Sequence, residues 1–80
     1  MAREARTEWR EFGERIRRYR AERGLSQAEL ARRVPVHDTY LSDVENGRRN
    51  IALTNIVRLA QALDMDAGKL LEGITPDPKA

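Results

Sequence analysis

The chain has 80 residues, enough for one small domain, and it lacks cysteine, which excludes disulfides, thiolate metal sites and cysteine nucleophiles. Its formal net charge is only +2, but eight arginines against five glutamates in residues 1–25 concentrate basic charge at one end, which permits a nucleic-acid partner without requiring one. No apolar run approaches the ~20 residues of a membrane helix and nothing resembles a signal peptide, so we expect a soluble, cytoplasmic protein.

Hydrophobic periodicity divides the chain into three parts. Residues 1–7 have no period and are predicted to be a flexible segment. Residues 8–74 alternate helical patterns with turn signals and are predicted to form one all-α domain. Residues 75–80, TPDPKA, combine prolines with polar residues, and we predict a disordered tail.

The first helix is predicted to follow Thr7, a good N-cap residue, and to end at Gly24. Four large apolar residues recur in it at spacings of three and four: Trp9, Phe12, Ile16 and Tyr19. This period turns all of them to one face, so we interpret them as core rather than as a platform on which bases stack.

Residues 24–47, GLSQAELARRVPVHDTYLSDVENG, contain the signals of two short helices joined by a tight turn. Ser26 and Glu29 have the spacing of a capping box, which starts the first helix of the pair. That helix must stop near Val34, because the proline that follows disfavours the α conformation in the residue before it.

The second helix of the pair is predicted to begin at His37 or Asp38 and to end at Gly47, where a left-handed residue is wanted. A connection of three or four residues between two such helices matches a helix-turn-helix. At about 100° per residue, short polar side chains share one arc of the second helix: Asp38, Thr39, Ser42, Asp43 and Asn46. Leu41 and Val44 point the opposite way. The polar arc has the size and chemistry to reach base edges in a major groove, or it is simply a solvated surface.

Two more helices complete the predicted domain. The first runs from about Leu53 to Leu63 and starts beside Ala52, which caps poorly. The second starts at Asp66 and ends near Gly73. The sequence therefore predicts a compact all-α fold of five helices.

The available side chains do not support a catalytic or metal-binding role. His37 is the only histidine, lies at a helix start and has no cysteine beside it, so we interpret it as an N-cap or as a neighbour of a DNA phosphate. The carboxylates are scattered over helix faces, and no glycine-rich phosphate loop is present. We therefore predict no enzyme activity, no metal site and no cofactor.

Three motifs occur in order along the chain: LSQAELARRV, then TYLSDVENGRRN, then LAQALDM. Together they resemble the phage-repressor-like family of bacterial and phage DNA-binding proteins, the Xre/Cro type, over residues 12–73. The most specific parts are the Leu-Ser-Gln-x-x-Leu-Ala opening of the first motif helix and the Glu-Asn-Gly-Arg close of the second. The resemblance implies a lambda-repressor-like domain of five helices that binds duplex DNA as a homodimer, usually to control transcription.

The resemblance also implies roles for side chains of the motif. The base-reading positions of the family correspond to Asp38, Thr39, Ser42 and Asp43. We add Tyr40, whose hydroxyl lies near enough to the helix start to reach a base or a phosphate. Gln27 matches a family position that hydrogen-bonds a phosphate with help from the helix N-terminus. His37 is also an expected phosphate contact. The other expected phosphate contacts lie at the end of the helix and in the loop after it: Asn46, Arg48, Arg49 and Asn50.

Arg20 and Glu45 are paired by the resemblance into a structural salt bridge that would lock the first helix to the reading helix. The alternative is two solvated charges. Two features depart from the family. Aspartates stand at two reading positions where many members have Gln, Arg or Lys, and Pro35 occupies a turn position where the family commonly has Gly. Either Asp38 or Asp43 can instead pair with Arg48 or cap the helix, and the other can accept a hydrogen bond from cytosine N4.

A homodimer is implied by the family and by size, because one reading helix covers only a few base pairs. Four residues near the last two helices provide more apolar surface than a five-helix core needs and are candidates for its interface: Ile51, Met65, Leu71 and Ile74. The alternative is that they close the core locally.

The predicted function is that of a sequence-specific transcriptional regulator that binds a palindromic operator as a homodimer, with residues 38–46 in the major groove. The stretch TYLSDVENGRRNIALTNI is similar to restriction–modification controller proteins, so we favour a small regulator of that kind. Two alternatives stay open. One is the antitoxin of a toxin–antitoxin pair, which also binds a protein partner, and the other is a protein-binding adaptor on the same fold.

Overall fold

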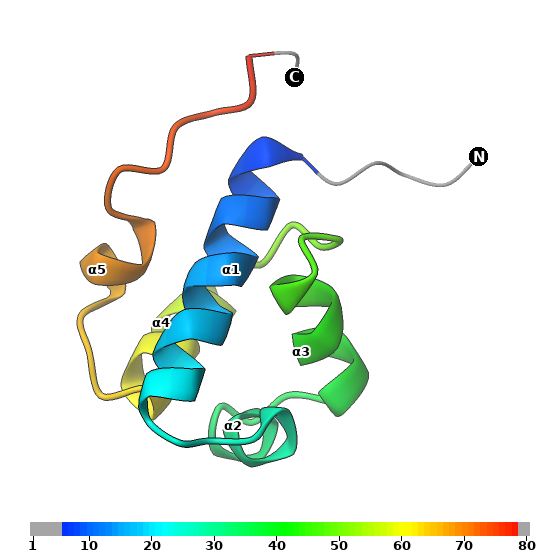
Figure 1. Cartoon of the computed structure of the whole chain (residues 1–80), viewed down its shortest axis with the longest axis vertical. Coiled ribbons are helices and arrows are strands. Elements are labelled where there is room, and N and C mark those ends of the chain that lie inside the picture. Colours follow the sequence, from blue (N-terminus) through cyan, green and yellow to red (C-terminus); the bar gives the residue numbers. More distant parts are fainter. Residues whose placement is uncertain (1–5, 79–80) are drawn as a thin grey trace.

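The computed structural model describes residues 6–78, so residues 1–5 of the predicted flexible segment and residues 79–80 of the predicted tail lie outside the described part. Within this range the chain forms five α-helices and no strand (Figure 1). Their bounds are α1 Thr7–Glu22, α2 Gln27–Arg33, α3 Asp38–Glu45, α4 Leu53–Ala62 and α5 Ala67–Leu71. The prediction of an all-α, five-helix domain is confirmed.

The start of α1 differs from the prediction, because Thr7 is the first helical residue and the expectation that it caps the helix is wrong. The N-cap position belongs to Arg6, whose side chain makes no capping hydrogen bond. The backbone N–H of Thr7 donates to Asp77 Oδ2 at 3.1 Å, and the N–H of Asp77 donates to Glu8 Oε1 at 3.0 Å. A carboxylate from the segment predicted as a tail therefore stabilises the positive end of the α1 dipole.

The caps around α2 and α3 agree with the sequence. Ser26 Oγ accepts from the Glu29 N–H at 3.1 Å and Glu29 Oε1 accepts from the Ser26 N–H at 2.8 Å, which confirms the capping box. His37 occupies the N-cap position of α3. Gly47 follows α3 with φ +71°, the left-handed conformation that glycine adopts at least cost.

The last two helices lie where they were predicted, with differences at their ends. Neither Ala52 before α4 nor Asp66 before α5 makes a side-chain capping hydrogen bond. The expected cap by Asp66 is therefore only positional, and α5 ends at Leu71, short of Gly73. Arg15 of α1 secures the last turn of α5, because its Nη1 donates to the carbonyl oxygens of Lys69, Leu70 and Glu72.

One core joins the helices, and α1 runs through the middle of the molecule, packed against α3 on one side and α5 on the other (Figure 1). Phe12 and Ile16 of α1 are buried, while Trp9 and Tyr19 are half-buried. The other buried hydrophobic residues of the described part are Leu30, Ala31, Val34, Leu41, Val44, Ile56, Leu59, Ala60, Leu63 and Leu70. Each of the five helices therefore contributes buried side chains to this core, and α3 packs mainly against α1 and α2.

Gly13 lets α1 and α3 cross closely. It is buried, and a Cβ atom on it would meet the backbone carbonyl oxygen of Glu45 at 2.6 Å and that of Val44 closer still. Because these neighbours are backbone atoms in a close-packed interior, any side chain here would push the end of α3 away from α1. The glycine thus fixes how deeply α3 is seated and how far its outer face projects.

Candidate nucleic-acid interface

α3 has one face in the core and the opposite face in solvent. Leu41 and Val44 are each 1% exposed, as the helical arithmetic predicts. In the polar arc, Asp38, Thr39 and Asn46 are exposed. Ser42 and Asp43 are half-buried. The start of the arc, Asp38 and Thr39, is open to solvent, whereas Asp43 and Asn46 contact other side chains of the protein.

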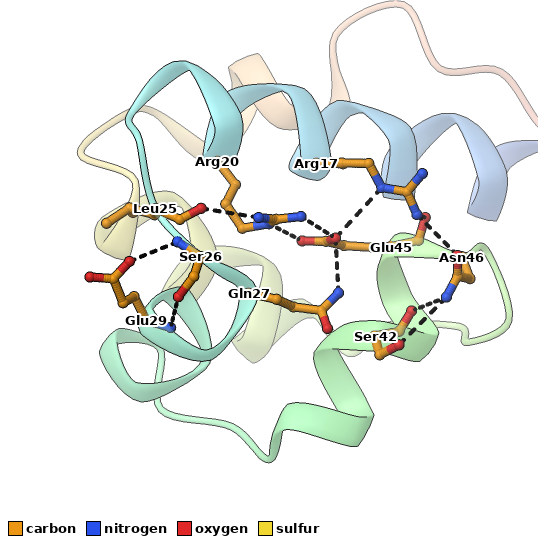
Figure 2. A network of polar contacts seen from close by, with 9 residues as sticks. All are labelled: Arg17, Arg20, Leu25, Ser26, Gln27, Glu29, Ser42, Glu45 and Asn46. Carbon is orange, nitrogen blue, oxygen red and sulfur yellow. Dashed lines mark hydrogen bonds and ion pairs between the residues drawn. The ribbon is translucent and has the colours of Figure 1, made fainter.

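Glu45 anchors α3 from behind (Figure 2). Its side chain has no exposed surface, and its carboxylate accepts from Arg20 Nε at 2.7 Å, Arg20 Nη2 at 3.0 Å and Gln27 Nε2 at 3.1 Å. Arg17 Nε lies 3.7 Å from the same carboxylate. The hydrogen bond to Glu45 raises the pKa of Arg20, so the Arg20 guanidinium stays charged at physiological pH. The bridge implied by the family resemblance thus joins α1, α2 and α3 at one buried group.

A second contact ties the end of α3 to α1. Arg17 Nη2 donates to Asn46 Oδ1 at 3.0 Å, and Asn46 Nδ2 donates to the carbonyl oxygen of Ser42 at 2.9 Å (Figure 2). The amide of Asn46, predicted to contact a phosphate, is therefore engaged by its own chain. The Arg17 side chain is 50% exposed beside it and offers a cation that the sequence reasoning did not single out.

The starts of both motif helices carry donors. Gln27 is half-buried in the first turn of α2, gives one amide hydrogen to Glu45 and keeps a second for another acceptor. His37 is exposed, and its Nδ1 accepts from the Thr39 N–H at 3.2 Å, which confirms the N-cap interpretation. In a neutral imidazole this leaves the hydrogen on Nε2.

Asp43 pairs with Arg49. The alternative that an aspartate of α3 pairs with Arg48 is therefore wrong. Arg49 Nη2 lies 3.3 Å from Asp43 Oδ2, and the Arg49 guanidinium lies 4.8 Å from the centroid of the Tyr40 ring. A planar guanidinium can use an aromatic face and a carboxylate together, which explains why Arg49 is held. The Tyr40 hydroxyl accepts from Asn55 Nδ2 at 3.0 Å and keeps its own hydrogen to donate.

The remaining residues predicted to contact DNA have no side-chain partner within residues 6–78. Arg48 and Asn50 are exposed in the loop after α3, and their side chains form no hydrogen bond or ion pair with residues 6–78. Asp38 is likewise exposed at the start of the reading helix. These three side chains are available to a partner.

The apolar candidates for a dimer interface divide into two groups. Ile51, Met65 and Ile74 are half-buried and pack against the core, as the local alternative expects, whereas Leu71 is 42% exposed. The most exposed large apolar side chains of the described part are two that sequence reasoning missed, Leu53 at 71% and Val57 at 50%, both on α4. The helical spacing of Leu53 and Val57 could have revealed them, because they lie off the stripe of buried α4 residues.

Residues 6–78 contain neither a metal-binding cluster nor a membrane-spanning helix. No group of three or more His, Asp or Glu side chains there could hold a metal ion. No helix in the same range is both long enough and apolar enough to cross a membrane.

Comparisons with known proteins agree with this geometry. A family model described as a helix-turn-helix domain matches residues 11–72. The control protein C.BamHI of Bacillus amyloliquefaciens is 38% identical over 65 residues, which cover 80% of each chain. The crystal structure of the restriction–modification controller protein C.AhdI from Aeromonas hydrophila superposes with a TM-score of 0.76 at 42% identity, covering 78% of this chain and 94% of that one.

A third relative was solved with a ligand. The crystal structure of SinR, the master regulator for biofilm formation, in complex with DNA superposes with a TM-score of 0.73 at 34% identity, covering 76% of this chain and 98% of that one. All three relatives are named as control or regulator proteins, in agreement with the prediction that the chain is not an enzyme. The chain belongs to the Xre/Cro-type helix-turn-helix family, in which its relatives include restriction–modification controller proteins.

Proposed function

We propose that this protein is a sequence-specific transcriptional regulator of the controller type, which binds a palindromic DNA operator as a homodimer in the bacterial cytoplasm. The observation that carries the proposal is α3, whose outer arc is open to solvent while the buried Glu45 and Leu41 hold it rigidly from behind. A rigid helix with short hydrogen-bonding side chains on its exposed face suits the major groove. The DNA complex of the relative SinR supports the same use of the fold.

Base reading falls to the exposed start of α3. Thr39 can donate or accept a hydrogen bond, or place its methyl group against a thymine methyl. Asp38 accepts from cytosine N4, whereas Asp43 is already neutralised by Arg49 and contributes less repulsion toward the DNA backbone. Ser42 completes the reading set, and Tyr40 supports it from beside α4.

Phosphate contacts surround the reading helix. His37 Nε2, the second amide hydrogen of Gln27 and the exposed Arg48 and Asn50 supply donors at the helix starts and in the following loop. Asn46 contacts the phosphates while bound to Arg17, and Arg49 does so while paired with Asp43. Arg17 adds a cation beside Asn46. These contacts fix register and orientation on the duplex and carry no sequence information.

The dimer uses the exposed apolar face of α4 and α5. Leu53 and Val57 lie one helical turn apart on α4, and Leu71 of α5 is the third exposed large apolar side chain within residues 6–78. A two-fold axis beside this face makes the contact self-complementary. The two reading helices are then expected to enter successive major grooves about 34 Å apart.

The proposal is tested by selecting bound sequences from a pool of random duplex DNA. We expect an inverted repeat to be enriched, and we expect that repeat to compete for the protein about a thousandfold or more better than random DNA. A protein that enriches no sequence, or whose bound DNA is displaced equally well by random duplex, would instead be an adaptor for other proteins.

A further inference from the structure

Tyr40 and Asn55 form a tie between the reading helix and α4. Tyr40 Oη accepts from Asn55 Nδ2 at 3.0 Å, and both residues are half-buried. The Arg49 guanidinium covers the Tyr40 ring at 4.8 Å from its centroid, which holds the ring in place from the loop side.

This tie joins two helices that otherwise touch little. α3 packs mainly along α1 and α2 while α4 packs along α5, and α3 with α4 is not among the helix pairs in extensive contact. Residues 46–52 between them contain no helix. In residues 6–78, the Tyr40–Asn55 bond is the only side-chain hydrogen bond that connects α3 to α4. The two helices also share the buried core, and this bond adds a directional constraint on the angle between them.

We infer that Asn55 is a positioning residue that sets the half-site spacing to which the dimer binds. The inference rests on the proposed function, in which α3 reads bases and α4 carries the dimer contact. Asn55 faces α3 from the side of α4 opposite Leu53 and Val57, the residues assigned to that contact. The path from the two-fold axis to each reading helix thus runs through the α3–α4 junction, so a rotation there moves both reading helices relative to the axis.

A positioning role for Asn55 differs measurably from simple stabilisation of the fold. Asn55 acts through Tyr40 and needs no contact with a base. Loss of its donor is expected to loosen the angle of α3, which weakens binding to the preferred operator and also lets the dimer accept other spacings. A side chain that only stabilises the fold would lower the melting temperature and leave the preference for spacing unchanged.

The experiment compares wild type with Asn55→Ala, Tyr40→Phe, the double variant and a control, Gln61→Ala, which removes an exposed amide from α4. Fluorescence anisotropy measures Kd for the selected operator and for operators with one base pair added or removed between the half-sites. Each single variant should bind the selected operator about 2- to 10-fold more weakly, the range of one hydrogen bond, and the double variant should be no weaker than the singles. The preference for the selected spacing should fall in all three and stay at the wild-type value in Gln61→Ala.

The outcomes are distinct. If wild type selects an operator but Asn55→Ala keeps its spacing preference, the inference is wrong and the proposed function stands. Weaker binding by Tyr40→Phe alone also overturns it, because the hydroxyl would then contact DNA directly. If wild type selects no operator, both proposals fail. Tyr40→Phe keeps the ring and supplies the test if Asn55→Ala does not fold.

Discussion

Glu45→Ala removes the group on which α1, α2 and α3 converge, and it should cost a large part of the stability of the domain. The wild-type carboxylate is fully buried and accepts three hydrogen bonds, two from Arg20 and one from Gln27. Removing one partner of a buried pair costs about 3–5 kcal/mol, because the other charge is left uncompensated. Arg20 is 17% exposed and keeps its bond to the carbonyl oxygen of Leu25 at 3.0 Å, so water and that carbonyl recover part of the loss. We therefore expect the free energy of unfolding to fall by about 2–4 kcal/mol.

Urea unfolding followed by circular dichroism at 222 nm measures this change, with the free energy taken from linear extrapolation. Arg20→Ala should fall in the same range, and the double variant should lose at least about 1 kcal/mol less than the two single losses combined, because the two side chains interact. Glu14→Ala, which removes an exposed glutamate from α1, is the matched control and should stay within about 0.5 kcal/mol of wild type. A loss below about 1 kcal/mol for Glu45→Ala, or losses that simply add, would refute the reasoning.

Three further changes test other parts of the structure. Gly13→Ala should lower the free energy of unfolding by about 1–3 kcal/mol, because its Cβ would meet the backbone carbonyl of Glu45 at 2.6 Å, whereas Gly68→Ala, with nothing within 4 Å, should be neutral or stabilising in the same urea titration. Leu53→Glu should convert the dimer to monomer in sedimentation equilibrium without changing the helical content, and a wild type that is monomeric at tens of micromolar would contradict the interface. The backbone N–H of the N-cap serine holds the pKa of Glu29 below its ordinary value of 4.5, so its contribution to stability is present above pH 4.5 and is lost as pH falls through the lowered folded-state pKa. Glu29→Gln should therefore lose less stability than wild type between pH 5 and pH 3, and equal losses would contradict the role of that carboxylate.

Local signals were sufficient for most helix boundaries. The capping box at Ser26 and Glu29 and the left-handed Gly47 depend only on residues within one turn, so the sequence determines them without knowledge of the fold. The prediction that Thr7 is the N-cap of α1 is wrong for the opposite reason. Its N–H is satisfied by Asp77, which lies at the other end of the chain and is brought there only by the packing of the whole domain.

The sequence predicts the parts of the interface that depend on the geometry of a single helix or on the family resemblance. The outer arc of α3 follows from helical geometry, and the Arg20–Glu45 pair follows from the resemblance. The partner of Asp43 depends on the path of the loop that brings Arg49 over the Tyr40 ring, and no spacing rule describes that path. The Asn55 contact likewise depends on how two helices cross, a relation that sequence periodicity does not contain.

Thr39 lies on the outer face of α3 and tests most directly whether this face chooses the DNA sequence. Selection from a random duplex pool should be repeated with Thr39→Ala and with Thr75→Ala, an exposed threonine remote from the motif in sequence. We predict that Thr39→Ala changes the preferred base at one or two positions of each half-site, while Thr75→Ala selects the wild-type operator. An unchanged operator for Thr39→Ala, with affinity lowered equally for all sequences or not at all, would show that this face does not read the DNA.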